Sequence, residues 1–152
     1  TFTGNVDITG DINATGNISA GNVSTTIITA TGDISAPTMT PQDITLKSFQ
    51  ETVVDLGTTN GDISSSVDAN QGSIFTMVAN GAVTFNSIAN VTAGSSFVVK
   101  IKQDVTGGHA LTSSMLFLGG NATLSAGAND IDVISVLYDG TDYLASLSHD
   151  YK

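Results

Sequence analysis

Hydrophobic and polar positions follow two different patterns in the two parts of the chain. Between Gly4 and Ile34, short units recur in which Gly is followed by Asn or Asp and then by Val or Ile. Successive units are five or six residues apart, with one step of 11 residues. Gly accommodates positive φ, and Asx side chains bond to nearby backbone groups. Each unit therefore predicts a sharp turn and a short extended piece.

A single chain that winds in units of this size buries too little apolar surface to offset its backbone entropy. The units can stack as a β-helix within one chain, or several identical chains can wrap around a shared axis. The repeat is short and lacks a thick aliphatic ladder, so we expect residues 1–36 to form a shaft of three intertwined chains. A flexible linker is the alternative, but a linker needs no regular β-branched position. The residues expected at the trimer axis are Val6, Ile12, Ile18, Val23 and Ile34.

Pro37 and Pro41 end the repeat, and prolines this close together disfavour both a helix and a central strand. We therefore assign residues 37–48 to a connector and residues 49–152 to a second domain, the head. The head contains longer β-branched and aromatic runs separated by turn residues, which predict strands. The expected strands are Gln50 to Leu56, Ile63 to Val67, Ser73 to Ala79, Ala82 to Asn86, Ser96 to Gln103, Met115 to Leu118, Ile131 to Asp139 and Tyr143 to Ser148.

Eight short strands in about a hundred residues are typical of an antiparallel β-sandwich or jelly roll. The dipeptides Asn80-Gly81 and Asp139-Gly140 predict hairpin turns. The run of residues 131–138 is apolar on both faces, which predicts a central strand or a strand covered by another subunit. No stretch shows sustained helical periodicity, so the predicted fold class is all-β.

The charge balance excludes several functions. The chain has four Lys, no Arg and 14 acidic residues, which give a net charge of −10. So few cations cannot offset many phosphates, so we predict no nucleic-acid partner, and a basic membrane-surface helix is excluded for the same reason. No apolar run is long enough to span a bilayer. The absence of Cys excludes disulfides and thiolate metal sites. The chain begins at Thr1 without an initiator Met, so we expect a fragment or a processed product.

Candidate catalytic groups are few, and turn chemistry explains them better. His109 and His149 are isolated and lack the spacing of metal ligands, so we predict no metal and no cofactor. Two carboxylate pairs resemble those of glycosidases, Asp130 with Asp132 and Asp139 with Asp142, but each pair borders a strand or turn. Turn formation also explains the Asp residues of the repeat better than calcium binding does, because the nonapeptide spacing is absent. We therefore predict a protein that is not an enzyme.

The Gly-Asn/Asp-Val/Ile units between Gly4 and Ile34 resemble the shaft repeats of bacteriophage fibre and appendage proteins. The second half is similar to a C-terminal module of structural proteins from marine and cyanobacterial phages. The pieces that carry this resemblance are Val54-Asp55-Leu56, Gly72 to Thr76, Val83-Thr84-Phe85, Ala93 to Phe97, Lys102 to Gly108, and Ile131-Asp132-Val133 leading to Tyr138-Asp139-Gly140. The chain departs from the family pattern at Leu111 to Leu118, where Ser113-Ser114-Met115 stand in place of an aromatic residue.

The resemblance implies a β-sandwich head on a homotrimeric virion fibre, exposed outside the particle on the tail or capsid. The expected partners are two further copies, other virion proteins, and a host-surface glycan or protein bound by the head. The aromatic and polar residues near expected turns are the candidate receptor contacts: His109, Tyr138, Asp139, Asp142 and Tyr143. Two alternatives remain open. One is a fibre or knob that decorates the capsid, and the other is a carbohydrate-binding module or a fragment of a tailspike-type depolymerase.

Overall fold

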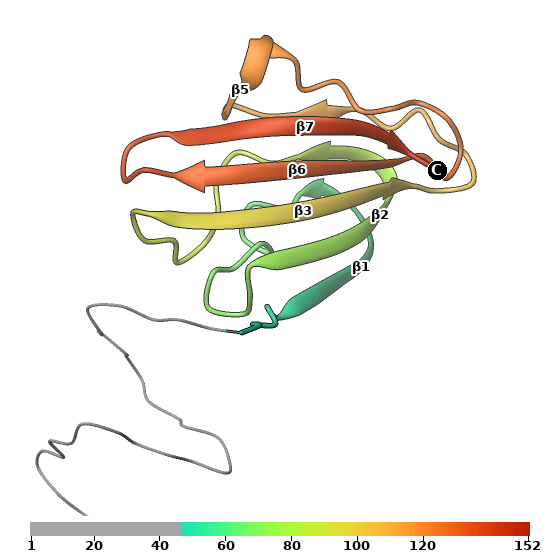
Figure 1. Cartoon of the computed structure of the whole chain (residues 1–152). Coiled ribbons are helices and arrows are strands. Elements are labelled where there is room, and N and C mark those ends of the chain that lie inside the picture. The colour runs from blue at the N-terminus through green and yellow to red at the C-terminus, as the bar shows by residue number, and fades with distance from the viewer. Residues whose placement is uncertain (1–46) are drawn as a thin grey trace, which may run out of the picture. The chain divides into compact units, whose positions relative to one another are not determined.

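The computed structural model describes residues 47–152, which include the whole predicted head (Figure 1). The predicted shaft, its five axis residues and most of the connector lie outside the described residues. Strands and one short 3-10 helix make up the regular structure of this part. They are β1 (Val53–Asp62), β2 (Ile74–Thr84), β3 (Ser95–Gln103), β4 (Leu111–Thr112), β5 (Leu116–Phe117), η1 (Leu118–Gly120), β6 (Ile131–Tyr138) and β7 (Tyr143–Tyr151).

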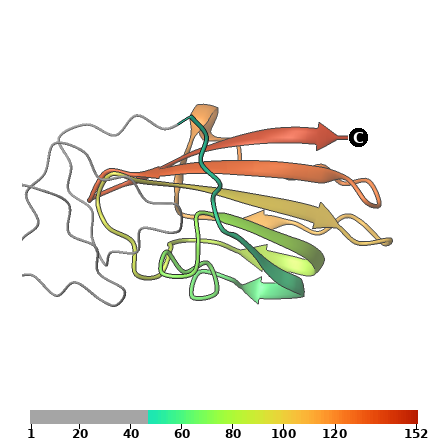
Figure 2. The ribbon, with the colours of Figure 1, turned by 60° about the horizontal axis from the view of Figure 1, so that its bottom comes forward.

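All seven strands belong to one mixed sheet, in the order β1-β2-β3-β6-β7-β5, and β4 pairs with β2 outside this path. Figures 1 and 2 show β1, β2, β3, β6 and β7 side by side in that order. The pairs β1–β2 and β2–β3 are parallel, whereas β3–β6 and β6–β7 are antiparallel. The sheet thus has a parallel half, which begins at β1, and an antiparallel half made by β3, β6 and β7. The two-residue edge strand β5 pairs with β7 in parallel.

The parallel half is built as successive coils. Parallel neighbours require a crossover, and residues 63–73 and 85–94 make the two crossovers that follow β1 and β2. The crossovers stack on each other through an isolated parallel bridge between Asp68 and Ala89. The Ala69 N–H donates to the Ala89 carbonyl at 2.9 Å, and the Ala89 N–H donates to the Val67 carbonyl at 2.9 Å. This half therefore has a β-solenoid-like arrangement.

The hydrophobic core lies between one face of the sheet and the segments that cross it. Strand alternation places Phe97, Val99 and Ile101 of β3 in this core, and the crossovers add buried side chains of their own. The fully buried apolar residues of largest volume come from both sources: Phe75, Phe85, Ile63, Ile101, Ile134, Val67, Val83 and Val99. The segments that join the strands are therefore part of the core.

The all-β class is confirmed, as are the central position of β6 and the Asp139-Gly140 hairpin between β6 and β7. The antiparallel sandwich is not what the described residues form, because their strands make one mixed sheet. Residues 63–67 were expected to be a strand, but they form turns of the first crossover. Ile63 and Val67 are buried because this crossover covers the core. Residues 63–67 therefore have the apolar composition of a strand without forming one.

The hairpin predicted at Asn80-Gly81 is wrong. β2 continues through this dipeptide, and the β1–β2 register shifts beside it, between Thr59 and Gly61 of β1. A type I′ turn needs positive φ at both central residues, and neither Asn80 nor Gly81 has one. Instead, the Asn60 side-chain amide donates to Asn80 Oδ1 at 2.8 Å, so the Asn side chains link the two parallel strands at this irregularity.

No helix in the described part of the chain is long and apolar enough to cross a membrane.

Candidate functional site

Four of the five predicted contact residues lie together at one end of the sheet. Tyr138 ends β6, Tyr143 begins β7, and the turn between them holds Asp139 and Asp142. Because Tyr138 pairs with Ser95 at the start of β3, the loop before β3 lies at the same end. We call this the hairpin end.

The hairpin turn is held by its own side chains. Asp139 Oδ1 accepts the backbone N–H groups of Thr141 and Asp142, both at 2.8 Å. The N–H groups of Asp142 and Thr141 stabilise the charged carboxylate and hold the pKa of Asp139 below its usual value. Gly140 has a φ of 107°, which L side chains rarely adopt. Asp139 therefore shapes the turn, as turn chemistry predicted, while its side chain stays exposed.

Two tyrosines form an aromatic pair beside this turn. The rings of Tyr138 and Tyr143 stack with their centroids 4.6 Å apart and an interplanar angle of 26°. The Tyr138 hydroxyl donates to the Gly140 carbonyl at 3.0 Å, and the backbone N–H of Ile88 donates to the Tyr143 hydroxyl at 3.4 Å. Both side chains are half-buried, so the pair joins the hairpin to the second crossover and still reaches the surface.

The fifth predicted residue, His109, lies at the opposite end of the sheet. It follows the last residue of β3, Gln103, whereas the hairpin end lies at the first. Nine strand residues separate the two ends by roughly 30 Å. His109 Nε2 is 2.9 Å from Asp104 Oδ1, and this hydrogen bond is the main reason that the pKa of Asp104 is lowered. His109 therefore cannot share one small ligand with the hairpin.

The hairpin end contains a pocket of about 480 Å³ that the sequence did not single out. Its walls come from the ends of the two crossovers and from the starts of β1 and β3. An ideal Cβ on Gly140 would lie 3.0 Å from the Ala93 Cβ, so the hairpin turn touches a loop that borders the pocket. The lining residues are Thr52, Ala69, Asn70, Gly72, Ser73, Asn90, Thr92, Ser95, Ser96 and Phe97.

Hydrogen bonds between the two crossovers hold the pocket's Asn residues. Asp68 Oδ1 accepts the Asn70 backbone N–H and the Asn90 side-chain amide, both at 2.9 Å. Both hydrogen bonds lower the pKa of Asp68, and the bond from the Asn90 amide has the larger effect. Asn90 has a φ of 54°, a left-handed conformation that Asn tolerates better than most residues. The pocket therefore presents hydroxyl and amide groups from a fixed backbone, with no charged side chain in its lining.

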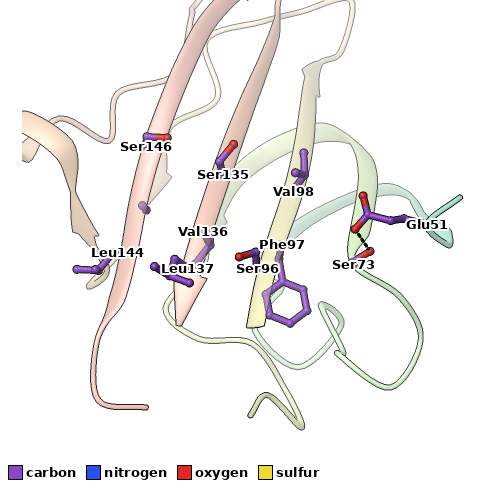
Figure 3. Close-up of a pocket in the computed structure, with 11 residues that line it drawn as sticks. Glu51, Ser73, Ser96, Phe97, Val98, Ser135, Val136, Leu137, Leu144 and Ser146 are labelled. Atoms are coloured by element: carbon purple, nitrogen blue, oxygen red, sulfur yellow. Dashed lines mark hydrogen bonds between the residues drawn. The ribbon is translucent and has the colours of Figure 1, made fainter. Parts of the chain in front are cut away.

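A second hollow, the outer-face groove, lies on the face of the sheet that the crossovers do not cover. Its volume is also about 480 Å³ (Figure 3). Serines and aliphatic residues of β3, β6 and β7 line most of it, and Glu51 accepts a hydrogen bond from the Ser73 hydroxyl at 2.8 Å at its edge. Ser73, Ser96 and Phe97 line both this groove and the hairpin-end pocket. The groove therefore borders the pocket.

The second carboxylate pair has a structural role. Asp132 is buried and accepts three hydrogen bonds, from the Ser125 N–H and hydroxyl at 2.7 Å each and from the Asp150 N–H at 3.0 Å. Asp130 Oδ2 accepts the Gly127 N–H at 2.6 Å. Turn and loop hydrogen bonding thus explains these carboxylates. Among the described residues, no group of three or more potential metal-ligating side chains comes together.

Sequence reasoning identified the hairpin but missed the pocket beside it. Asn70, Asn90 and Thr92 look like any other small polar loop residues in a chain rich in Asn, Thr and Ser. Their proximity depends on the stacking of one crossover on the next, and that stacking depends on parallel pairing. Once the strands were expected to be antiparallel, no sequence signal placed these loops together.

Comparison with known proteins gives a family match over most of the head. A family model described as "Putative phage tail fibre C-terminal domain" matches residues 58–143, which is more than half of the chain. The match spans the strands from within β1 to the first residue of β7, including the hairpin turn and most of the pocket lining. No curated protein and no solved structure matches the chain.

Proposed function

Since the chain belongs to the family of phage tail fibre C-terminal domains, we propose that its head contacts the host surface at the end of a homotrimeric tail fibre. The family places the protein in the phage tail as a structural component of the virion, associated with other virion proteins. Receptor contact and the trimer are the parts we add. The single observation that carries receptor contact is the neutral polar pocket at the hairpin end.

The chemistry of this pocket favours a host glycan. Sugars present many hydroxyl groups, and the pocket offers hydroxyl and amide groups that both donate and accept hydrogen bonds. The stacked Tyr138 and Tyr143 lie at the same end of the sheet and add an aromatic surface. A protein receptor is the second possibility, because the exposed Asp139 and Asp142 would suit a basic partner.

A trimeric fibre would make a shallow pocket sufficient. Linking several weak sites raises the effective concentration for the second and third contacts, so overall affinity increases without a deep site. Val6, Ile12, Ile18, Val23 and Ile34 remain the predicted trimer axis. His109, at the far end of the sheet, is removed from the proposed contact surface.

Of the two alternatives, the family match favours a tail fibre over a capsid knob. The depolymerase alternative needs a pair of free carboxylates on opposite sides of a sugar linkage. Asp132 and Asp130 are engaged in loop hydrogen bonds, and Asp139 in turn formation. We therefore retain a structural and adhesive function.

The test is adsorption to host cells of phage that carry pocket variants. Asn70→Ala and Thr92→Ala remove polar groups that line the pocket but not the outer-face groove, and they leave the backbone hydrogen bonds of the crossovers in place. We expect the double variant to reduce the adsorption rate at least tenfold. The purified variant chain should also compete less well than the unmodified chain for binding to host polysaccharide.

Thr106→Ala is the matched control, because Thr106 is exposed near His109 at the other end of the sheet. This variant should adsorb like the unmodified phage, and so should His109→Ala if its fold is retained. Normal adsorption by the Asn70 and Thr92 double variant would contradict the proposed site. Adsorption lost only with His109→Ala would place receptor contact at the opposite end.

A further inference from the structure

The outer face of the sheet carries a row of apolar side chains with no partner among the described residues. Leu116, Leu144, Leu137 and Ser96 follow one another across four strands in direct register. Leu116 is 55% exposed, and Leu137 and Leu144 are 42% exposed each. Adjacent leucines in one row form a continuous apolar strip, unlike apolar residues scattered singly over a surface.

The neighbouring row continues this surface with small side chains. Val98, Ser135 and Ser146 lie in register on β3, β6 and β7, and Figure 3 shows them with Leu137 and Leu144 along the outer-face groove. Val53, on the β1 side of the same row, is 59% exposed. A surface of serines and aliphatic residues permits close approach of a second flat surface, because no long side chain stands in the way.

Charge on this face is balanced, unlike charge on the rest of the domain. The outer face carries Lys100 and Lys102 on β3, with Asp55 on β1 and Glu51 at the groove edge. The other described residues include eight acidic side chains and two Lys, a net charge of −6. Two copies of an acidic domain repel each other least where the net charge is zero.

The charges on the outer face are also separated into two sides. Asp55 pairs with Thr76 of β2, and Thr76 pairs with Lys100 of β3, so the acidic and basic positions lie two strands apart. The distance is about 10 Å at the usual spacing of neighbouring strands. Around a three-fold axis, with the outer face of each copy turned towards the axis, the acidic side of one copy can therefore lie towards the basic side of the next.

We propose that the outer face is the contact between copies of this chain, with the strip of Leu116, Leu137 and Leu144 at its centre. This inference rests on the self-association in the proposed function, and it identifies the residues of the head that make the contact. The host is then contacted at the hairpin end, and the apolar face is covered within the fibre. A neutral face with complementary charged sides fits another copy better than it fits an anionic cell surface.

The first test is the mass of the full chain in solution. Leu137→Asp puts a charge in the centre of the proposed contact, and Leu118→Asp puts the same charge on a leucine that is 82% exposed and outside the groove. We expect Leu137→Asp to shift the population towards the monomer, with at least a tenfold weaker association constant. Leu118→Asp should keep the mass of the unmodified chain. Circular dichroism checks that both variants are folded.

A second test does not depend on the folding of a disruptive variant. The chain has no Cys, so Ser135→Cys and Thr141→Cys each introduce a single thiol. Ser135 is exposed on the outer face, and Thr141 is exposed in the hairpin turn. We expect a maleimide to react with the thiol at 135 at least tenfold more slowly than with the thiol at 141. The difference should disappear when Leu137→Asp is added.

Equal reaction rates at the two positions in an assembled chain would overturn the proposed contact, as would an unchanged association constant for folded Leu137→Asp. A monomeric unmodified chain would overturn both the contact and the trimer. None of these results depends on host adsorption, which is measured separately with the pocket variants. Failure of the contact between copies is therefore distinguishable from failure of receptor binding.

Discussion

The parallel and antiparallel halves of the sheet bury the same face by different means. In the parallel half, the crossovers after β1 and β2 supply apolar residues of their own, among them Ile63, Val67 and Phe85. In the antiparallel half, β6 and β7 are joined by a short turn, and the segment between β3 and β6 covers the core. Of that segment, Met115 and Leu124 are the buried apolar residues.

Buried polar groups hold the cover of the antiparallel half in place. Gln103 is buried, and its amide donates to the carbonyls of His109 and Ser125 while its oxygen accepts the His109 N–H. Asp132 binds Ser125 from the neighbouring strand. The coils thus depend mainly on apolar packing, and the antiparallel half depends on hydrogen bonds at a few fixed points. The two halves should therefore differ in the kind of substitution that damages them most.

The largest expected effect is the loss of apolar packing under a crossover. Phe85→Ala removes a fully buried ring from the second crossover, and we expect the free energy of unfolding to fall by about 3–5 kcal/mol. Phe49→Ala is the matched control, because Phe49 is 74% exposed and should change stability by no more than about 0.5 kcal/mol. Urea titration followed by circular dichroism measures both. A loss below about 1 kcal/mol at Phe85 would show that the crossover does not hold the coils.

A smaller effect is expected in the antiparallel half when Asp132 is replaced. In the unmodified chain, three donors from Ser125 and Asp150 share the two oxygens of Asp132. Asp132→Asn leaves only one side-chain oxygen, and each buried donor that loses its partner costs about 1–3 kcal/mol. Ser125→Ala removes one of these hydrogen bonds with its donor, so its cost should be nearer 1 kcal/mol. The same urea titration gives both values. Equal losses for the two variants would mean that the carboxylate has no special role in holding this segment.

This division between the halves also explains what the sequence could predict. The strands of the antiparallel half follow from local signals, namely the alternation of Phe97, Val99 and Ile101 and the Asp139-Gly140 turn. The parallel pairing of β1 with β2 depends on contacts between residues about 20 positions apart, such as Asn60 with Asn80. Local propensity cannot show whether Asn80-Gly81 ends a strand or bends it. The hairpin end could be predicted because its turn is a local signal. The pocket beside it could not, because it depends on the stacking of the two crossovers.

A still smaller effect is expected for the tyrosine pair, which connects the hairpin to the second crossover. Tyr138→Leu and Tyr143→Leu, alone and combined, form a double-mutant cycle whose coupling energy should be about 0.5–1.5 kcal/mol. Tyr143→Phe keeps the ring, so it should keep most of this coupling. Coupling near zero would show that the rings touch without stabilising the hairpin. If a tyrosine variant remains fully folded but adsorbs to host cells more slowly, the slower adsorption reflects lost receptor contact.

The smallest expected effect for a single residue is the pH dependence of the turns, which both halves share. The pKa values of Asp62 at the end of β1 and Asp68 in the first crossover, and of Asp104 and Asp139 in the other half, are lowered chiefly by hydrogen bonds to the carboxylates. A lowered pKa in the folded state adds stability above the unfolded value near 4, and this stability is lost as the pH falls further. The melting temperature should therefore be level above pH 5 and fall between about pH 4 and pH 2. Asn at each position should flatten this fall slightly, and by similar amounts in the two halves, because all four carboxylates are at least partly exposed and therefore screened by solvent. If one substitution alone abolished the fall in melting temperature at low pH, the acid sensitivity would lie in a single turn, and so in one half of the sheet.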